Sequence, residues 1–200
     1  MQKLKISHLF PRHQSIDLAV EALNAGKVII FPTETVYGIG CSLQHLEAIK
    51  RIFEIKGRPA DKPLPVLISN TKQLNGLVKE VPERAMAIIK KFWPGPLTLV
   101  FDKTDRIPDI VSCNSETVGI RMPDDKIVLE IIEKLGSPLV ATSANLSGQE
   151  PPSRPEEIKI EADLLVDGGR CRLKIPSTVL DVRADPPLIL RMGSIDPLKS

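Results

Sequence analysis

The chain has 200 residues and a formal net charge of +2, from 27 lysines and arginines against 25 aspartates and glutamates. Hydrophobic residues make up 42% of the chain and charged residues 26%, a composition that excludes intrinsic disorder and suits one domain. So small a net charge neither demands nor excludes a nucleic-acid partner, although dedicated nucleic-acid binders usually carry a larger or more clustered excess.

Helical and strand patterns alternate through the first two thirds of the chain, and strand patterns dominate its end. The predicted elements are, in chain order, a helix over 15–25, a strand over 28–31, a helix over 43–55, a strand over 65–68, a helix over 82–92, strands over 97–101 and 118–121, a helix over 127–135, and strands over 139–142, 162–166, 178–182 and 188–191. A polar, glycine-containing turn is predicted over 33–40. We therefore predict an α/β protein of the α+β type, with helices flanking one twisted, mixed sheet. The whole chain, 1–200, is expected to form a single domain with its core over about 14–195.

No part of the sequence predicts export or a membrane span. The first ten residues include Lys3 and Lys5 but no apolar run of signal-peptide length, and no segment approaches the ~20 apolar residues of a spanning helix. Three separated cysteines, with no C-x-x-C pair, are typical of reduced thiols. We therefore expect a cytoplasmic protein without a membrane partner.

Three polar clusters at 32–38, 56–62 and 142–148 are candidates for ligand binding, because ligands of open sheets bind where loops converge. Residues 32–38 bring two threonines, a glutamate and a tyrosine to one turn, where they could bind a small polar substrate. The alternative is that the threonine and glutamate side chains only form hydrogen bonds with nearby backbone groups. Residues 56–62 hold three cations suited to phosphate oxygens, or alternatively a solvated basic loop. Residues 142–148 offer hydroxyls, an amide and backbone N–H groups to an anion, or alternatively cap a helix.

Several common nucleotide and metal motifs are missing from the sequence. There is neither a G-x-x-x-x-G-K-[ST] loop nor a complete G-x-G-x-x-G fingerprint. The histidines His8, His13 and His45 do not stand at ligand spacing with carboxylates, so no metal site built from protein side chains alone is expected.

Taken together, several short motifs resemble the YrdC/TsaC family of threonylcarbamoyl-AMP synthases, in its short, single-domain form. They are FPTETVYG at 31–38, K-x-R-P at 56–59, Lys62, WPGPLT at 93–98, VGIR at 118–121, TSANLSG at 142–148 and PST at 176–178. Their order and spacing are specific, whereas no single motif would be. The resemblance implies a YrdC-like fold around a basic cleft.

The same resemblance implies a reaction in which L-threonine, bicarbonate and ATP give L-threonylcarbamoyladenylate and pyrophosphate. Mg²⁺ would be held mainly by the ATP phosphates. A partner transferase complex would use the product to make threonylcarbamoyladenosine beside the tRNA anticodon.

Site residues also follow from the resemblance, position by position. The threonine contacts would be Thr33, Thr35, Tyr37, Arg121 and Ser177. The ATP contacts would be Lys56, Arg58, Lys62, Thr117, Ser143, Asn145 and Arg191, of which Lys56, Arg58, Ser143 and Asn145 would be catalytic. At Leu67 the chain departs from longer relatives, which often carry histidine there for a threonine contact.

Two other functions compete with the synthase. One is a module that binds structured RNA, such as tRNA, ribosomal RNA or another double-stranded RNA, without catalysis, although the net charge of +2 argues against it. The other is a carbamoyl-transfer domain using carbamoyl phosphate. Such domains usually belong to longer chains with zinc-finger cysteines.

Overall fold

The computed structural model describes residues 1–5 and 12–199. The helices are α1 (Arg12–Asn24), α2 (Leu46–Lys56), α3 (Glu83–Phe92), α4 (Asp109–Ser112) and α5 (Lys126–Leu135), with short 3-10 turns at Thr71–Leu74 and Pro155–Glu157. The strands are β1 (Gln2–Lys5), β2 (Ile29–Phe31), β3 (Gly38–Ser42), β4 (Val66–Leu67), β5 (Leu97–Asp102), β6 (Thr117–Arg121), β7 (Leu139–Ser143), β8 (Leu164–Asp167), β9 (Thr178–Asp181) and β10 (Leu188–Arg191). All the predicted helices and strands are confirmed, with boundaries shifted by a few residues at some ends.

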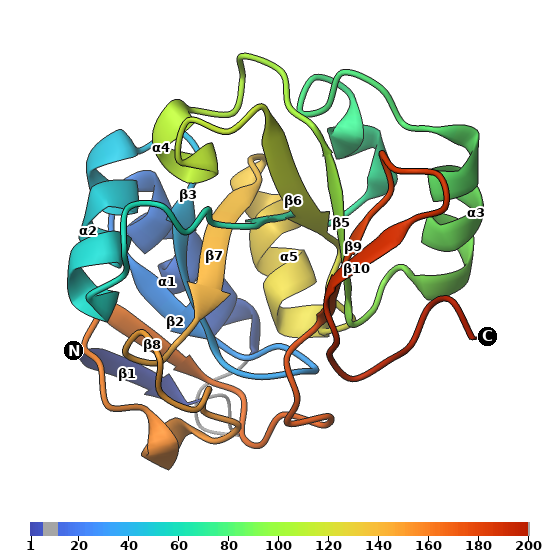
Figure 1. The fold of residues 1–200 in the computed structure, drawn as a ribbon. Helices are drawn as coiled ribbons and strands as arrows, with labels where there is room; N and C mark the ends of the chain where they lie inside the picture. The colour runs from blue at the N-terminus through green and yellow to red at the C-terminus, as the bar shows by residue number, and fades with distance from the viewer. Residues whose placement is uncertain (6–11, 200) are drawn as a thin grey trace.

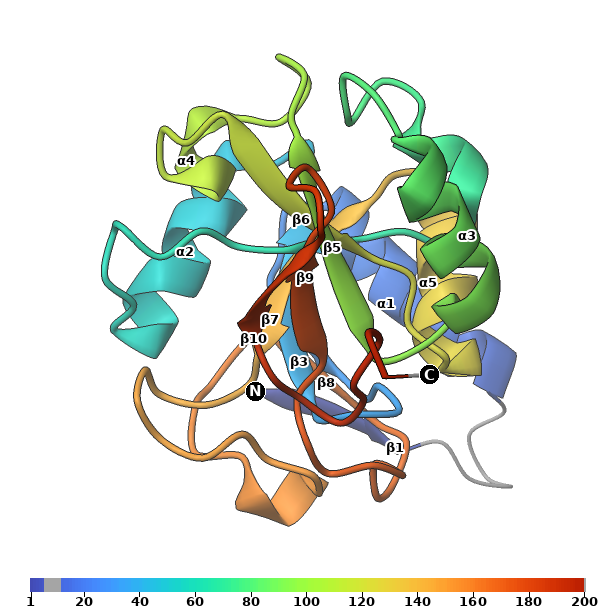
Figure 2. The same ribbon diagram turned by 45° about the vertical axis from the view of Figure 1, so that its right-hand side comes forward.

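The strands form one mixed sheet in the order β1-β8-β2-β3-β7-β4-β6-β5-β9-β10. The sheet contains both parallel pairs, such as β5 with β9, and antiparallel pairs, such as β3 with β7. The sheet twists through the centre of the molecule (Figure 1). Figure 2 shows α2 and α4 on one side of it and α1, α3 and α5 on the other. This arrangement confirms the predicted class, an α/β fold with helices flanking a mixed sheet.

Two apolar clusters form the core, one on each face of the central strands. Alternate residues of β2 divide between them, because successive side chains of a strand point to opposite faces. Ile30 packs in the cluster that includes α2, through Ile49 and Ile52. Ile29 packs in the cluster that contains the buried faces of α1 and α5.

Strand β3 occupies part of the segment that was predicted to be a turn, so that prediction is wrong for residues 38–40. The glycines at 38 and 40 suggested a turn, but here they permit close packing of strands. A Cβ on Gly40 would lie 2.6 Å from the Val140 carbonyl oxygen and 3.1 Å from the Phe31 ring. Only a residue without a side chain therefore fits between β7 and Phe31.

One further strand and one helix were not predicted. Strand β1 pairs in parallel with β8 at one edge of the sheet, and α4 is a single turn that begins after Pro108. Both are too short for a hydrophobic period to identify them. Among the helices of the described residues, none is long and apolar enough to cross a membrane.

Candidate active site

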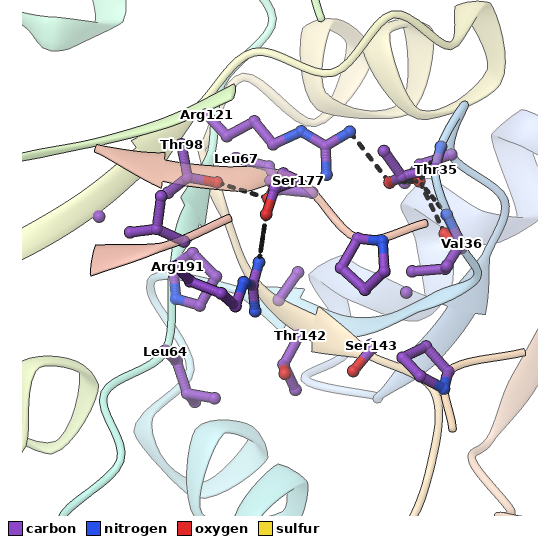
Figure 3. Close-up of a pocket in the computed structure, with 18 of the residues that line it drawn as sticks. Thr35, Val36, Leu64, Leu67, Thr98, Arg121, Thr142, Ser143, Ser177 and Arg191 are labelled. Carbon is purple, nitrogen blue, oxygen red and sulfur yellow. Dashed lines mark hydrogen bonds between the residues drawn. The ribbon is translucent and has the colours of Figure 1, made fainter. Parts of the chain in front are cut away.

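Three loops and the ends of several strands surround a cavity of about 360 Å³ (Figure 3). Its size is in the range of small-molecule binding sites. Nine of the predicted site residues line it, namely Thr33, Thr35, Tyr37, Arg58, Thr117, Arg121, Ser143, Ser177 and Arg191. Lys56, Lys62 and Asn145 are not among the lining residues. The fold thus brings together residues that are more than 150 positions apart in the sequence.

The loop between β2 and β3 forms one wall through a turn closed by Thr33. The Thr33 hydroxyl donates to the Val36 carbonyl at 2.6 Å and accepts the backbone N–H groups of Thr35 and Val36, both at 3.2 Å. This turn places the Thr35 hydroxyl 2.8 Å from that of Thr33. The local hydrogen bonding considered from the sequence is therefore present, and it presents both threonines to the cavity.

Tyr37 lines the cavity, but its hydroxyl is directed elsewhere. It donates to the Gly169 carbonyl at 2.6 Å, beyond the end of β8. Burial, with the nearby Asp167 charge, raises the pKa of the phenol well above its usual range, so the hydroxyl stays protonated. Tyr37 therefore ties two loops together through its hydroxyl.

Arg121 ends β6 and is held at three points. Its Nε donates to the Gly95 carbonyl at 3.1 Å, and its Nη2 donates to the Thr35 hydroxyl at 3.1 Å. The same Nη2 lies 2.7 Å from a carboxylate oxygen of Glu34. Figure 3 shows the guanidinium of Arg121 extended toward Thr35. Its orientation is therefore fixed without a ligand.

Arg58 follows the end of α2, where Gly57 adopts the left-handed conformation, with φ of 55°, and terminates the helix. The Arg58 guanidinium donates to the carbonyls of Lys62 and Pro63, both at 2.9 Å. The Lys62 side chain is exposed. The loop therefore fixes the Arg58 cation with its own backbone, and Lys62 contributes a carbonyl to this arrangement.

Arg191 and Ser177 meet at the far end of the cavity. Nη2 of Arg191 donates to the Ser177 carbonyl at 2.7 Å and to its hydroxyl at 3.3 Å. The Ser177 hydroxyl also lies 2.9 Å from that of Thr98 on β5 (Figure 3). Thr98 was not predicted as a site residue, although it stands in a motif that the resemblance identified.

Lys56 lies behind the cavity and supports the loop after β7. Its ammonium donates to the Ser143 carbonyl and, at 2.6 Å, to the Asn145 carbonyl. The Asn145 amide in turn donates to the carbonyls of Leu146 and Gln149, at 2.8 and 2.7 Å. Burial, with the charge of Arg58, lowers the pKa of Lys56 to about 8.

The cavity is electropositive and partly withdrawn from water. Burial lowers the pKa of both Arg58 and Arg191, and the positive charges of Arg121 and Arg58 lower that of Arg191 further. Within the described residues, Arg121 forms an ion pair with a carboxylate, whereas Arg58 and Arg191 form none. Such a cavity favours a ligand with several negative charges.

Much of the rest of the lining is apolar and was not predicted. It includes Leu64, Leu67, Val100, Val179 and Leu190. Leu67 thus gives the cavity a hydrocarbon surface at the position where longer relatives were expected to carry histidine. No local sequence signal separates these residues from ordinary core residues, because each stands in or beside an apolar run.

The described residues contain no group of three or more His, Cys, Asp or Glu side chains that could hold a metal ion. His8, considered from the sequence, lies outside the described residues.

Comparison with known proteins gives consistent matches over most of the chain. Residues 21–193 match the family model described as "Sua5_yciO_yrdC: Telomere recombination". The threonylcarbamoyl-AMP synthases of Pyrococcus abyssi and Bacillus subtilis are 44% and 43% identical over 90% and 88% of this chain. The matches cover 54% and 53% of those proteins, so the chain spans about half of their length. A putative threonylcarbamoyl-AMP synthase of Methanocaldococcus jannaschii is 37% identical over 89% of this chain and 84% of its own.

Solved structures with the same fold include P. abyssi Sua5 in complex with L-threonine, with a TM-score of 0.88 and 41% identity. That match covers 96% of this chain and 57% of the other. Escherichia coli YciO has a TM-score of 0.85 and 29% identity, with 98% of this chain and 96% of that chain covered.

Proposed function

This chain belongs to the Sua5/YciO/YrdC family, and we propose that it synthesises threonylcarbamoyl-AMP from L-threonine, bicarbonate and ATP. The threonine amine and bicarbonate form a carbamate with loss of water. A carbamate oxygen then attacks the α-phosphorus of ATP, so that an O–P bond forms while the bond to pyrophosphate breaks. Identities of 44% and 43% to named synthases support this reaction.

The observation that carries the proposal is the set of guanidinium groups from Arg58, Arg121 and Arg191 around one cavity of about 360 Å³. A triphosphate and a carbamate would repel one another in water. Positive charges fixed beforehand in a partly dry site offset that repulsion and stabilise the charge that develops on the leaving pyrophosphate. The chemistry then rests on positioning and electrostatics, without a protein nucleophile.

At the threonine end, we assign Arg121 to the substrate carboxylate, because a guanidinium forms strong charge-assisted hydrogen bonds with a carboxylate. The hydroxyls of Thr35 and Ser177 provide neutral contacts close to it. Thr33 and Tyr37 hold this wall in place through their own hydrogen bonds. A P. abyssi relative whose structure contains L-threonine supports the assignment.

At the ATP end, we assign Arg58, Arg191 and the Ser143 hydroxyl to the phosphates, and Thr117 to a further nucleotide contact. Lys56 and Asn145 act here by fixing the backbone of the loop after β7. The exposed Lys62 is free to approach the phosphates from the rim of the loop. Mg²⁺ would arrive with ATP, because the described residues offer no carboxylate cluster to bind it.

The proposed product is an activated threonylcarbamoyl group, so a transferase complex acting on tRNA is the proposed partner, in the cytoplasm. Residues 14–195 are proposed as the core of the domain that carries the site, because strands β2 to β10 share one sheet.

The test is pyrophosphate release by the purified chain with ATP and bicarbonate, with and without L-threonine. We expect threonine-dependent release, weaker with L-serine, and a fall of about 10²–10³-fold in Arg58→Ala through loss of charge stabilisation. Arg106→Ala, which removes an exposed arginine outside the cavity, is the matched control. Absence of release from the wild type, together with salt-sensitive tRNA binding, would favour the RNA-binding alternative.

A further inference from the structure

Glu34 is a buried carboxylate that the proposed chemistry has not used. Its side chain is 2% exposed, and Oε1 lies 2.7 Å from Nη2 of Arg121. Apart from this ion pair, neither carboxylate oxygen has a hydrogen-bond partner within the described residues. A buried charge with so few partners is costly, so its presence calls for a reason beyond stability.

Glu34 lies outside the lining of the main cavity. Its neighbours Thr33 and Thr35 line the cavity, whereas Glu34 does not. It lines instead a second, smaller cavity of about 150 Å³, together with Asp124 and Cys171. A ligand in the main cavity therefore meets Arg121 and not Glu34, so any effect of Glu34 on that ligand must act through Arg121.

Within the described residues, two of the three guanidinium nitrogens of Arg121 are engaged by protein groups, and the third is not. Nε and Nη2 are engaged by Gly95, Thr35 and Glu34, whereas Nη1 takes part in none of these contacts. Removal of the Glu34 charge would leave a buried cation near two other guanidinium groups, those of Arg58 and Arg191. The repulsion among these cations favours rotation of the Arg121 side chain away from them.

We propose that Glu34 is a positioning residue for the amino-acid substrate: its carboxylate fixes Arg121 so that Nη1 is presented to the substrate carboxylate. The proposal rests on the proposed function, since it assigns the threonine carboxylate to Arg121.

The test compares Glu34→Gln, which keeps the shape of the side chain and removes its charge, with the wild type. We expect the KM for L-threonine to rise about 10- to 100-fold through misplacement of Arg121, while the KM for ATP and kcat stay within about twofold. Calorimetric titration with L-threonine alone should show the same weakening. Glu47→Gln is the matched control, because Glu47 on α2 is 82% exposed and outside both cavities.

A merely structural role would lower the melting temperature and change all kinetic constants together, and that result would overturn the proposal. An unchanged threonine KM in a folded, active Glu34→Gln variant would overturn it equally. If Glu34→Gln does not fold, Glu34→Asp is measured against the same criteria, since it keeps the charge but shortens the reach to Arg121. Lack of threonine-dependent turnover in the wild type would instead refute the proposed function, so the two failures are distinguishable.

Discussion

Replacement of Lys56 by methionine separates the role of this ammonium in catalysis from its role in stability. Methionine has a similar length and no charge, so it fills the same space. The ammonium donates to the carbonyls of Ser143, the last residue of β7, and of Asn145 in the loop that follows, and Ser143 lines the cavity. Lys56→Met therefore releases that loop without opening a large void.

Two terms of opposite sign set the change in the free energy of unfolding. The Ser143 carbonyl still accepts the Asn145 N–H at 3.0 Å, so the Asn145 carbonyl is the group that loses its donor, at a cost of about 1–3 kcal/mol. The pKa of Lys56 falls from 10.5 to about 8, so keeping it charged in the fold costs about 3 kcal/mol, which the substitution relieves. The net change should lie within about 2 kcal/mol of zero.

Turnover should respond very differently from stability. Without the Lys56 contacts, the Ser143 hydroxyl is no longer held at one position, and we expect a fall of about 10²–10³-fold in kcat/KM. Urea denaturation and pyrophosphate release measure the two effects on the same preparation. Lys50→Met is the control, because Lys50 lies on the same helix, is 54% exposed and pairs with Glu47. A stability loss above about 4 kcal/mol, or unchanged turnover, would refute the reasoning.

Two further predictions concern stability. Between a folded pKa of about 8 and an unfolded pKa of 10.5, Lys56 binds fewer protons in the folded chain, so its contribution to the free energy of unfolding rises with pH. Burial raises the pKa of Cys41 and Cys171, and these thiols therefore make the free energy of unfolding fall as pH rises above their usual pKa. Both proteins share this effect, so the quantity to measure is the free energy of unfolding of the wild type minus that of Lys56→Met. It should rise by about 2 kcal/mol between about pH 7.5 and 10, and a value that does not change with pH would contradict the assignment. Gly40→Ala should destabilise the fold by about 1–3 kcal/mol in thermal unfolding, because its Cβ would lie 2.6 Å from the Val140 carbonyl oxygen, and an unchanged melting temperature would show that β3 and β7 can separate without cost.

Local patterns were sufficient to predict most of the fold. The apolar period of α5 and its Gly136 cap can both be recognised from residues that are close together in the sequence, and the structure contains both. Strand β3 was missed because Gly38 and Gly40 carry the composition of a turn. Their role depends on Phe31 and β7, which are brought beside them only by the tertiary fold.

For the candidate site, too, some features could be predicted from the sequence and others could not. The motifs that carry the resemblance pointed to Arg58, Arg121 and Arg191, and all three line the cavity. The direction of a side chain was not predictable, because it depends on partners distant in the sequence. Lys56 turns away toward the loop after β7, and the Tyr37 hydroxyl turns away toward Gly169.

The partners of the site's cations explain how the cavity keeps its charge. Arg58, Arg191 and Lys56 are each held by backbone carbonyls. A carbonyl dipole orients a cation without neutralising it, so the full positive charge remains available to an anionic ligand. A carboxylate at the same place would compete with the incoming phosphates.

Arg121 differs, since within the described residues it is the cavity-lining guanidinium that pairs with a carboxylate, Glu34. The difference matches the ligands proposed for the two ends of the cavity. A triphosphate with several negative charges requires uncompensated cations, whereas a single carboxylate requires mainly a donor at a fixed angle. A carboxylate behind Arg121 fixes that angle and lowers the local charge. Exchanging these two kinds of partner would therefore weaken ATP binding at one end and threonine selection at the other.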